Sequence, residues 1–128
     1  MSVLNNSATD FDRLMRANLV KVFNEREPAK RFGAISELYC EDAMLYEPPD
    51  TAAKGYAAIS AAVTRLLASL PPDFEFTATG PAIGHHGLGR LHWRAGPPSG
   101  PIAVTGMDIA RFENGRIHSL HVFIEPTA

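Results

Sequence analysis

The sequence predicts an α+β domain in which helices gather before a run of mostly antiparallel strands. Through much of the first 70 residues, apolar side chains recur every three or four positions, which is typical of amphipathic helices. After Pro72 they alternate with polar side chains, which is typical of strands. The chain has 128 residues, a usual size for one hydrophobic core. We therefore expect residues 1–128 to form a single domain.

Two helices are expected to open the chain. Ser7 and Thr9 are candidate N-caps of the first helix. Its apolar residues are Phe11, Leu14, Met15, Leu19, Val22 and Phe23. The second helix is expected to begin at Pro28, because proline suits the first helical turn. Four side chains would share its buried face, namely Phe32, Ile35, Leu38 and Tyr39.

A short strand and a third helix are expected next. The strand covers residues 43–47 and must end at Pro48 and Pro49, since proline cannot donate to a β ladder. Helical spacing then returns from about residue 55 to residue 70. The apolar face of this helix consists of Ile59, Val63, Leu66, Leu67 and Leu70.

Four strands are expected after Pro72. The first carries Phe74 and Phe76, and the second carries Leu91 and Trp93.

The last two strands, residues 102–112 and 117–124, would form a hairpin around the Asn-Gly turn signal of Glu113-Asn114-Gly115. Helices followed by such a meander favour a curved sheet that wraps its concave face around them. A hollow between the two layers would suit a small molecule.

Three short segments, taken in order, carry a family resemblance. They are residues 38–43 (LYCEDA) with Glu47-Pro48, residues 55–59 (GYAAI), and residues 106–112 (GMDIARF) with residues 115–117 (GRI). Together they resemble the NTF2-like superfamily, in particular its SnoaL-like and ketosteroid isomerase-like branch. The resemblance implies a cone-shaped NTF2-like (cystatin-like) roll, with three N-terminal helices in the concave face of a curved, mostly antiparallel sheet.

The resemblance also implies two site residues. The general-base aspartate of the isomerase branch falls on Glu47, and its second pocket aspartate, which stays protonated and donates to an oxyanion, falls on Asp108. The oxyanion tyrosine of that branch would lie near Leu19 and a supporting tyrosine near Val63, and neither position is a tyrosine here. The implied site therefore departs from that of a steroid isomerase.

The residue pattern itself supports both carboxylates. Glu47 shares a strand face with Leu45, which would point it toward the hollow; otherwise it is a solvated loop residue. Asp108 lies in the middle of an apolar strand, where aspartate is uncommon. On an apolar concave face its pKa should rise, making it a proton donor near neutral pH; otherwise it pairs with Arg90 or Arg111.

Residues 90–94 allow two strand registers, which would place opposite sets of side chains in the hollow. With Leu91 and Trp93 inside, the hollow is lined by an aromatic ring, whereas with Arg90, His92 and Arg94 inside, an arginine would stand beside the carboxylate, as in the epoxide hydrolase branch. Burying one tryptophan costs less than burying two arginines, which favours the first register.

Six side chains are expected to contact a bound molecule. They are Tyr39, Tyr56, Trp93, His118, Leu120 and Val122. The alternatives are a core role for either tyrosine or for the tryptophan, a surface position for Tyr56, and a structural hydrogen bond for His118.

The composition argues against several classes of protein. A formal net charge of −2 leaves no excess of basic residues for nucleic acid, and no apolar run is long enough to span a membrane. His85 and His86 would point to opposite strand faces, so we expect no metal, and the chemistry needs no cofactor. The single Cys40 and the absence of a signal-peptide pattern favour the cytoplasm.

Two functions from different classes fit these observations. The first is an enzyme that uses Glu47 and Asp108 for isomerisation, cyclisation, dehydration or epoxide hydrolysis of a small apolar molecule. The second is a non-catalytic module that binds a ligand or a partner. In either case we expect a homodimer through the convex sheet face, where Ile109, His121 and Phe123 would form an apolar patch.

Overall fold

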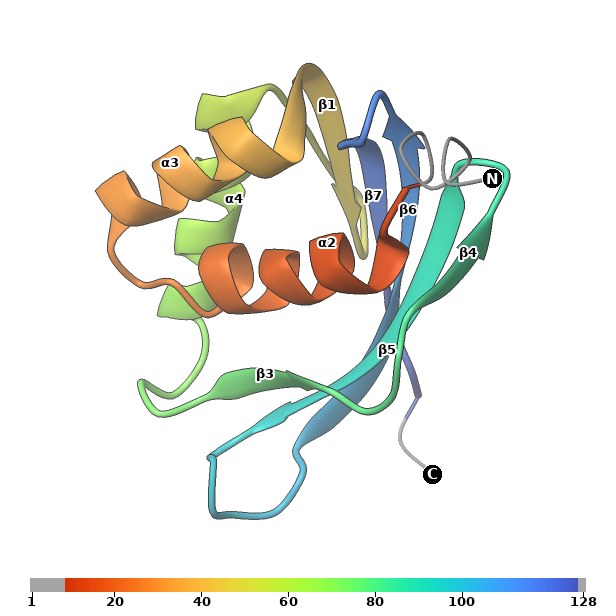
Figure 1. Ribbon diagram of the computed structural model, residues 1–128. Helices are drawn as coiled ribbons and strands as arrows, with labels where there is room; N and C mark the ends of the chain where they lie inside the picture. Colours follow the sequence, from red (N-terminus) through yellow and green to blue (C-terminus); the bar gives the residue numbers. More distant parts are fainter. Residues whose placement is uncertain (1–8, 127–128) are drawn as a thin grey trace.

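In the computed structural model, which describes residues 9–126, three helices lie in the concave face of one curved sheet (Figure 1). The predicted α+β class is confirmed. The helices are α2 (Phe11–Asn18), which continues into the π-helical turn η1 (Leu19–Phe23), then α3 (Pro28–Leu38) and α4 (Tyr56–Ala68). The strands are β1 (Tyr39–Glu47), β2 (Thr51–Lys54), β3 (Glu75–Ala78), β4 (Ile83–His85), β5 (Leu88–Gly96), β6 (Val104–Glu113) and β7 (Arg116–Ile124).

The ends of two helices differ from the sequence prediction. Asp10, rather than Thr9, caps α2, because its side chain accepts a hydrogen bond from the backbone N–H of Arg13 at 3.0 Å. Ser7 lies outside the described residues. Helix α3 begins at Pro28 as predicted. Its expected last apolar residue, Tyr39, instead begins strand β1.

The buried face of α3 also differs in one position. Ile35 is fully buried and Leu38 nearly so, but Phe32 is 43% exposed. The ring of Phe32 packs edge-on against Tyr56 on the neighbouring helix, with 6.0 Å between ring centroids. The prediction of a buried Phe32 was therefore wrong, because this side chain covers a neighbouring ring near the surface.

The seven strands form one sheet of mixed direction. Their order is β2-β1-β7-β6-β5-β3, and β4 pairs separately with β5. Every pairing is antiparallel except β1 with β7, which is parallel. The long strands β1, β7, β6 and β5 lie side by side in the sheet, and their inward faces form the floor beneath the helices (Figure 1).

A buried arginine, absent from the sequence prediction, fixes α4 against α3. Arg31 is 1% exposed and donates hydrogen bonds to the backbone oxygens of Glu25, at 2.9 Å, and Ser60, at 3.0 Å, and to the hydroxyl of Thr64. Burial lowers the pKa of its guanidinium. Because buried polar groups are costly unless paired, these bonds tie the two helices together and so position the α4 side chains that face the sheet.

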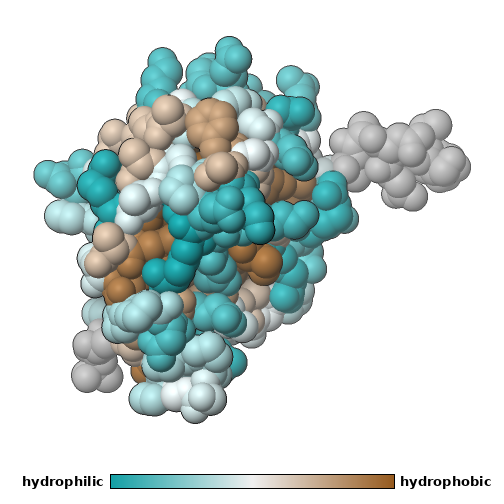
Figure 2. All heavy atoms as spheres, turned by 90° about the vertical axis from the view of Figure 1, so that its left-hand side faces the viewer, coloured by the Kyte–Doolittle hydropathy of each residue, from teal (hydrophilic) through white to brown (hydrophobic). Residues whose placement is uncertain are grey.

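The helices pack their apolar sides onto the sheet to make one core. Its fully buried members are Val22, Ile35, Tyr39, Ala43, Leu45, Ile59, Val63, Leu91, Ala110 and Leu120. Hydrophilic side chains break up the apolar surface of the face that Figure 2 shows. Within residues 9–126, no helix is long and apolar enough to cross a membrane.

Candidate functional site

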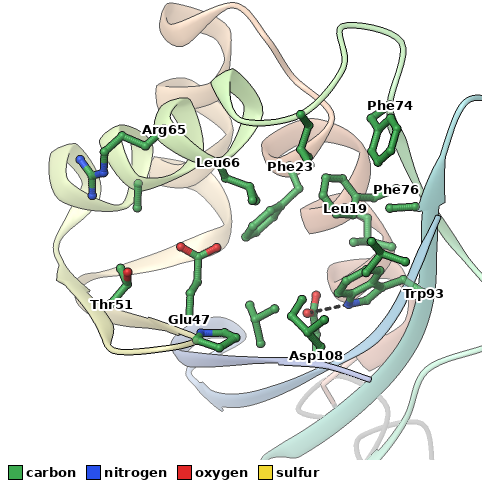
Figure 3. Close-up of a pocket in the computed structure, with 17 residues that line it drawn as sticks. Leu19, Phe23, Glu47, Thr51, Arg65, Leu66, Phe74, Phe76, Trp93 and Asp108 are labelled. Carbon is green, nitrogen blue, oxygen red and sulfur yellow. Dashed lines mark hydrogen bonds between the residues drawn. The ribbon is translucent and has the colours of Figure 1, made fainter. Parts of the chain in front are cut away.

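The side chains of the helices and of the sheet do not completely fill the space between these two layers. A cavity of about 380 Å³ lies between α4, η1 and the inward face of the sheet (Figure 3). Its walls are mainly apolar, and its only charged lining residues among those described are Glu47, Arg65 and Asp108. The predicted hollow is therefore present, and both predicted carboxylates lie on its lining.

One wall of the cavity is aromatic. Phe76 packs edge-on against Phe23, with 6.1 Å between ring centroids, and against Trp93, with 5.3 Å between centroids. These contacts hold the three rings in a continuous row. Phe74 extends the same wall (Figure 3).

The π-helical turn supplies the wall above the sheet. Its widened hydrogen bond runs from the backbone N–H of Asn24 to the carbonyl of Leu19 at 2.9 Å. Leu19 and Phe23, at the two ends of the turn, both line the cavity, whereas Val22 between them enters the core. Such turns recur at functional sites, because they re-aim side chains within a helix.

Strand β5 has the first of the two predicted registers. Leu91 is fully buried and Trp93 is 3% exposed, whereas Arg90, His92 and Arg94 are exposed on the other face. Trp93 lines the cavity, and no arginine of β5 enters it. The arrangement associated with the epoxide hydrolase branch is therefore absent from this strand.

Among the residues that the structure describes, one neutral donor holds Asp108 in the floor of the cavity. Asp108 as a whole residue is 3% exposed, and the indole N–H of Trp93 donates to its Oδ1 at 2.9 Å. In the part of the chain that the structure describes, no ion pair reaches this carboxyl, and both Arg90 and Arg111 are exposed. Burial raises the pKa of Asp108 to about 7, the Trp93 bond opposes this rise, and the charge of Glu47 adds to it.

Glu47 stands at the end of β1, where the chain turns at Pro48. The side chain is half-buried and points up into the cavity (Figure 3). Burial raises the pKa of its carboxyl, and the nearby cation of Arg65 opposes that rise. Glu47 is therefore more easily protonated than a surface glutamate, and it faces the same apolar space as Asp108.

Four of the six side chains predicted to contact a ligand do not line the cavity, and the first three of these are Tyr39, Tyr56 and Leu120. Tyr39 is fully buried in the core, where its hydroxyl donates to the side-chain oxygen of Asn18, and burial raises the pKa of its phenol well above 10. Tyr56 donates to the carbonyl of Tyr39 at 3.0 Å and packs against α3. Leu120 is fully buried beneath the helices.

His118 fails to reach the cavity for a different reason. In the β6–β7 ladder Phe112 pairs with Ile117 and Arg111 pairs with Ser119, so His118 is the extra residue of a β-bulge. Ile117 takes the inward position, at 1% exposure, while the His118 ring turns outward and lies 3.8 Å from the carboxylate of Glu113. The bulge thus breaks the period of two on which the prediction rested, although Val122 does line the cavity.

Two polar residues of the rim were missed. Arg65 follows Ala62 by three positions on α4, and both line the cavity, so helical spacing from the apolar face could have found it. Thr51 belongs to β2, a strand that the sequence did not predict. Together with Glu47 they make the rim polar and the interior apolar.

The geometry provides a proton donor and a proton acceptor in one apolar space. With a pKa of about 7, Asp108 is largely protonated in slightly acidic solution and can donate a hydrogen bond or a proton. Glu47, across the cavity, is the second carboxyl. Environments that separate the pKa values of two carboxyls are typical of acid/base sites.

Comparison with known protein families agrees with this geometry. A model of the SnoaL-like domain matches residues 18–120, which is most of the chain. No curated protein matches the sequence.

Solved structures show the same fold at low sequence identity. One is a candidate isomerase of the SnoaL-like family from Agrobacterium tumefaciens strain C58, with a TM-score of 0.81 and 22% identity over 89% of this chain and 96% of that one. Another is a candidate ketosteroid isomerase from Kribbella flavida, with a TM-score of 0.68 and 15% identity over 92% of this chain and 79% of that one. A protein of unknown function from Methylobium petroleophilum, described as having a cystatin-like fold, also has a TM-score of 0.68, at 17% identity over 92% of this chain and 78% of that one. The predicted cystatin-like, NTF2-like roll is confirmed.

Proposed function

This chain belongs to the SnoaL-like domain family, and on that premise we propose that it performs cofactor-independent acid/base chemistry on a small, largely apolar molecule. Glu47 would act as the base and protonated Asp108 as the acid. The observation that carries the proposal is that two carboxyls, both with raised pKa, face one apolar cavity.

The proposed roles follow from where each carboxyl lies. For a ketone, the carboxylate of Glu47 would take a proton from the carbon next to the carbonyl, and the C–H electron pair would move toward the carbonyl oxygen. The protonated carboxyl of Asp108 would donate a hydrogen bond to that oxygen as its negative charge develops. In a β,γ-unsaturated ketone, return of the proton from Glu47 to the γ carbon would move the double bond and complete an isomerisation.

Related reactions need the same pair. Cyclisation would use the enolate to attack a second carbonyl, whose oxygen takes the proton of Asp108. Dehydration would lose water, after Asp108 protonates the leaving hydroxyl and Glu47 removes a proton from the neighbouring carbon. Epoxide hydrolysis would add water to a ring carbon, with Glu47 taking a proton from that water and Asp108 protonating the epoxide oxygen. Leu19 lines the cavity and Val63 is fully buried, so neither tyrosine of the steroid isomerases has a counterpart at these positions. Asp108 would therefore carry the oxyanion contact without a tyrosine partner from these helices.

Hydrogen exchange on a simple ketone tests the base and the acid without knowledge of the natural substrate. The probe is 2-tetralone, an apolar ketone with acidic C–H bonds, and NMR in D₂O measures the exchange of those hydrogens. We expect Glu47→Gln to lower the protein-catalysed rate by about 100- to 10,000-fold, the usual contribution of a general base. Asp108→Leu, which removes the donor while keeping similar bulk, should cost about 100- to 1,000-fold.

The matched control is Glu41→Gln, on an exposed position of the same strand, β1. It should leave the rate unchanged. If Glu47→Gln and Asp108→Leu exchange the ketone as fast as the original protein, the acid/base proposal is wrong. Retained binding of 2-tetralone in that case would support the alternative, a non-catalytic ligand-binding module.

We also propose a homodimer through the convex face of the sheet. Ile109 and His121 are cross-strand neighbours there, His121 stacks on Tyr46 at 4.6 Å between ring centroids, and Phe123 is 48% exposed. Exposed apolar groups clustered in this way are typical of interfaces.

The unpaired Cys40 agrees with a reducing compartment such as the cytoplasm.

Sedimentation at micromolar concentration tests the dimer. We expect the chain to sediment as a dimer and Phe123→Glu to sediment as a monomer. Val20→Glu, which changes another exposed apolar side chain on the helical side of the molecule, should remain dimeric. A monomer for the unchanged protein would contradict the proposal.

A further inference from the structure

The hydrogen bond between Trp93 and Asp108 joins two neighbouring strands inside the cavity. The indole N–H on β5 reaches Oδ1 of the carboxyl on β6 at 2.9 Å, and each residue is only 3% exposed (Figure 3). The indole has one donor and no acceptor, so it can only donate. Oδ1 must therefore accept in both protonation states of Asp108.

A glycine makes this contact sterically possible. Gly106 is the cross-strand partner of Trp93, and the indole ring lies over it. A Cβ at position 106 would stand 2.2 Å from Cζ2 and 2.5 Å from Cη2 of the ring, and 2.6 Å from the backbone oxygen of Phe123. The backbone oxygen of Phe123 cannot move away cheaply. A side chain at position 106 would therefore have to displace the indole ring, which stands on the same spot.

We propose that Trp93, seated on Gly106, is a positioning residue that makes Oδ2 the only oxygen of Asp108 able to exchange a proton with a bound molecule. In the neutral acid the proton stays on Oδ2, because Oδ1 is occupied as an acceptor. In the carboxylate the same indole bond becomes charge-assisted and stronger. The catalytic part of this inference rests on the proposed function, whereas the coupling between the indole and the carboxyl does not.

The surroundings of Asp108 allow its ionisation to be followed separately. Glu47 from β1 is the charged group that raises its pKa, and the buried phenol of Tyr39 stays neutral because its own pKa is raised. Arg65 of α4 stands at the rim beside Glu47. His92 adjoins Trp93 in sequence but is exposed on the opposite strand face.

The indole itself reports on the carboxyl. The chain contains one tryptophan, so its indole N–H gives one cross-peak in a ¹H–¹⁵N NMR spectrum. We expect that peak to move downfield with a midpoint near pH 7, as Asp108 ionises and the bond strengthens. Asp108→Asn should abolish the step and Glu47→Gln should move it to lower pH. His92→Gln should leave the step in place.

Two substitutions test the positioning role. Trp93→Phe removes the donor and keeps a ring, so the side-chain ¹³C resonance of Asp108 should titrate at higher pH than in the unchanged protein. The limb of the ketone-exchange profile that depends on the protonated acid should move upward by the same amount. Gly106→Ala should shift the indole peak upfield and weaken its response to pH.

An indole peak that does not respond between pH 5 and pH 9, or an Asp108 titration unaffected by Trp93→Phe, would overturn the inference. Trp93→Phe decides the question if Gly106→Ala does not fold. The predicted titrations combined with unchanged ketone exchange in Glu47→Gln would refute the acid/base function while leaving the indole–carboxyl coupling established.

Discussion

At the scale of the residue, Asp108 is buried, and among the described residues its carboxyl has one hydrogen-bond donor, the indole N–H of Trp93. An indole N–H stabilises the carboxylate less than a guanidinium would, so burial dominates and the acid remains neutral to about pH 7. The same aspartate beside Arg90 would be ionised and unable to donate. The register of β5, which turns its arginines outward, therefore decides the chemistry of β6.

This burial makes folding stability depend on pH. Below about pH 4 the carboxyl is protonated in both states, and between about pH 4 and pH 7 only the folded state keeps the proton. The contribution of Asp108 to stability is thus complete at low pH and is lost as the pH rises toward 7. We expect this loss to reach about 4 kcal/mol, at about 1.4 kcal/mol for each unit of pKa shift.

Urea unfolding at several pH values measures the loss. The stability difference between the unchanged protein and Asp108→Asn should shift in favour of the variant from pH 4 to pH 8. Asp42→Asn, on an exposed position of β1, should follow the unchanged protein throughout. Parallel curves for the unchanged protein and Asp108→Asn would contradict a raised pKa.

The positions of these two carboxyls on the cavity side of the sheet could be predicted from the sequence, because side chains alternate regularly between the two faces of both strands. Glu47 and Asp108 follow the period of two along β1 and β6, and both line the cavity. His118 could not be placed, because a bulge in β7 depends on how the neighbouring strands pair and leaves no mark in the residue pattern. Arg65 was missed because the lining face of α4 was predicted from its hydrophobic residues alone and was not continued to the charged residue one turn after Ala62.

At the scale of the element, the strong patterns and the short strand β3 were predictable, whereas the short strands β2 and β4 were not. The three helices and the long strands follow from their apolar spacing. β2 has the sequence Thr-Ala-Ala-Lys, with little strand propensity, and exists because it pairs with β1 after the Pro48-Pro49 turn. β4 has only three residues and depends likewise on its pairing with β5. Tertiary pairing also extends β1 back to Tyr39, through the acidic residues Glu41 and Asp42.

The β6–β7 hairpin depends on its predicted turn. Asn114 has a φ of 52° and Gly115 a φ of 77°, in the region that favours glycine. Gly115→Ala should therefore lower the free energy of unfolding by about 1 to 2 kcal/mol. Gly80→Ala is the matched control, because a Cβ at Gly80 would meet open space, and it should change stability by less than about 0.5 kcal/mol in chemical denaturation. An equal effect of both would contradict a strained turn.

At the scale of the whole molecule, the sheet separates two functions. Its concave face carries the cavity and both carboxyls, and its convex face carries the exposed Tyr46, His121 and Phe123. The hollow is a packing defect, since closely packed side chains would be more stable. Retaining such a hollow is consistent with a site that must admit a molecule.

Filling the hollow should therefore separate stability from function. Ala62→Leu adds apolar volume at a lining position of α4 without touching either carboxyl, so it should slow exchange of 2-tetralone while raising the free energy of unfolding by up to about 1 kcal/mol. Ala61→Leu, on the exposed side of the same helix, should leave exchange unchanged. Exchange that is equally fast in both variants would place the reacting molecule outside the cavity.

The state of Asp108 in the unchanged protein is the quantity on which these arguments depend. It can be measured by following the side-chain ¹³C carboxyl resonances of aspartate across pH, with Asp108→Asn to assign the signal. We expect the Asp108 carboxyl to titrate with a midpoint near pH 7, as a buried acid that holds its proton. A midpoint near pH 4, that of an ordinary exposed aspartate, would contradict the account.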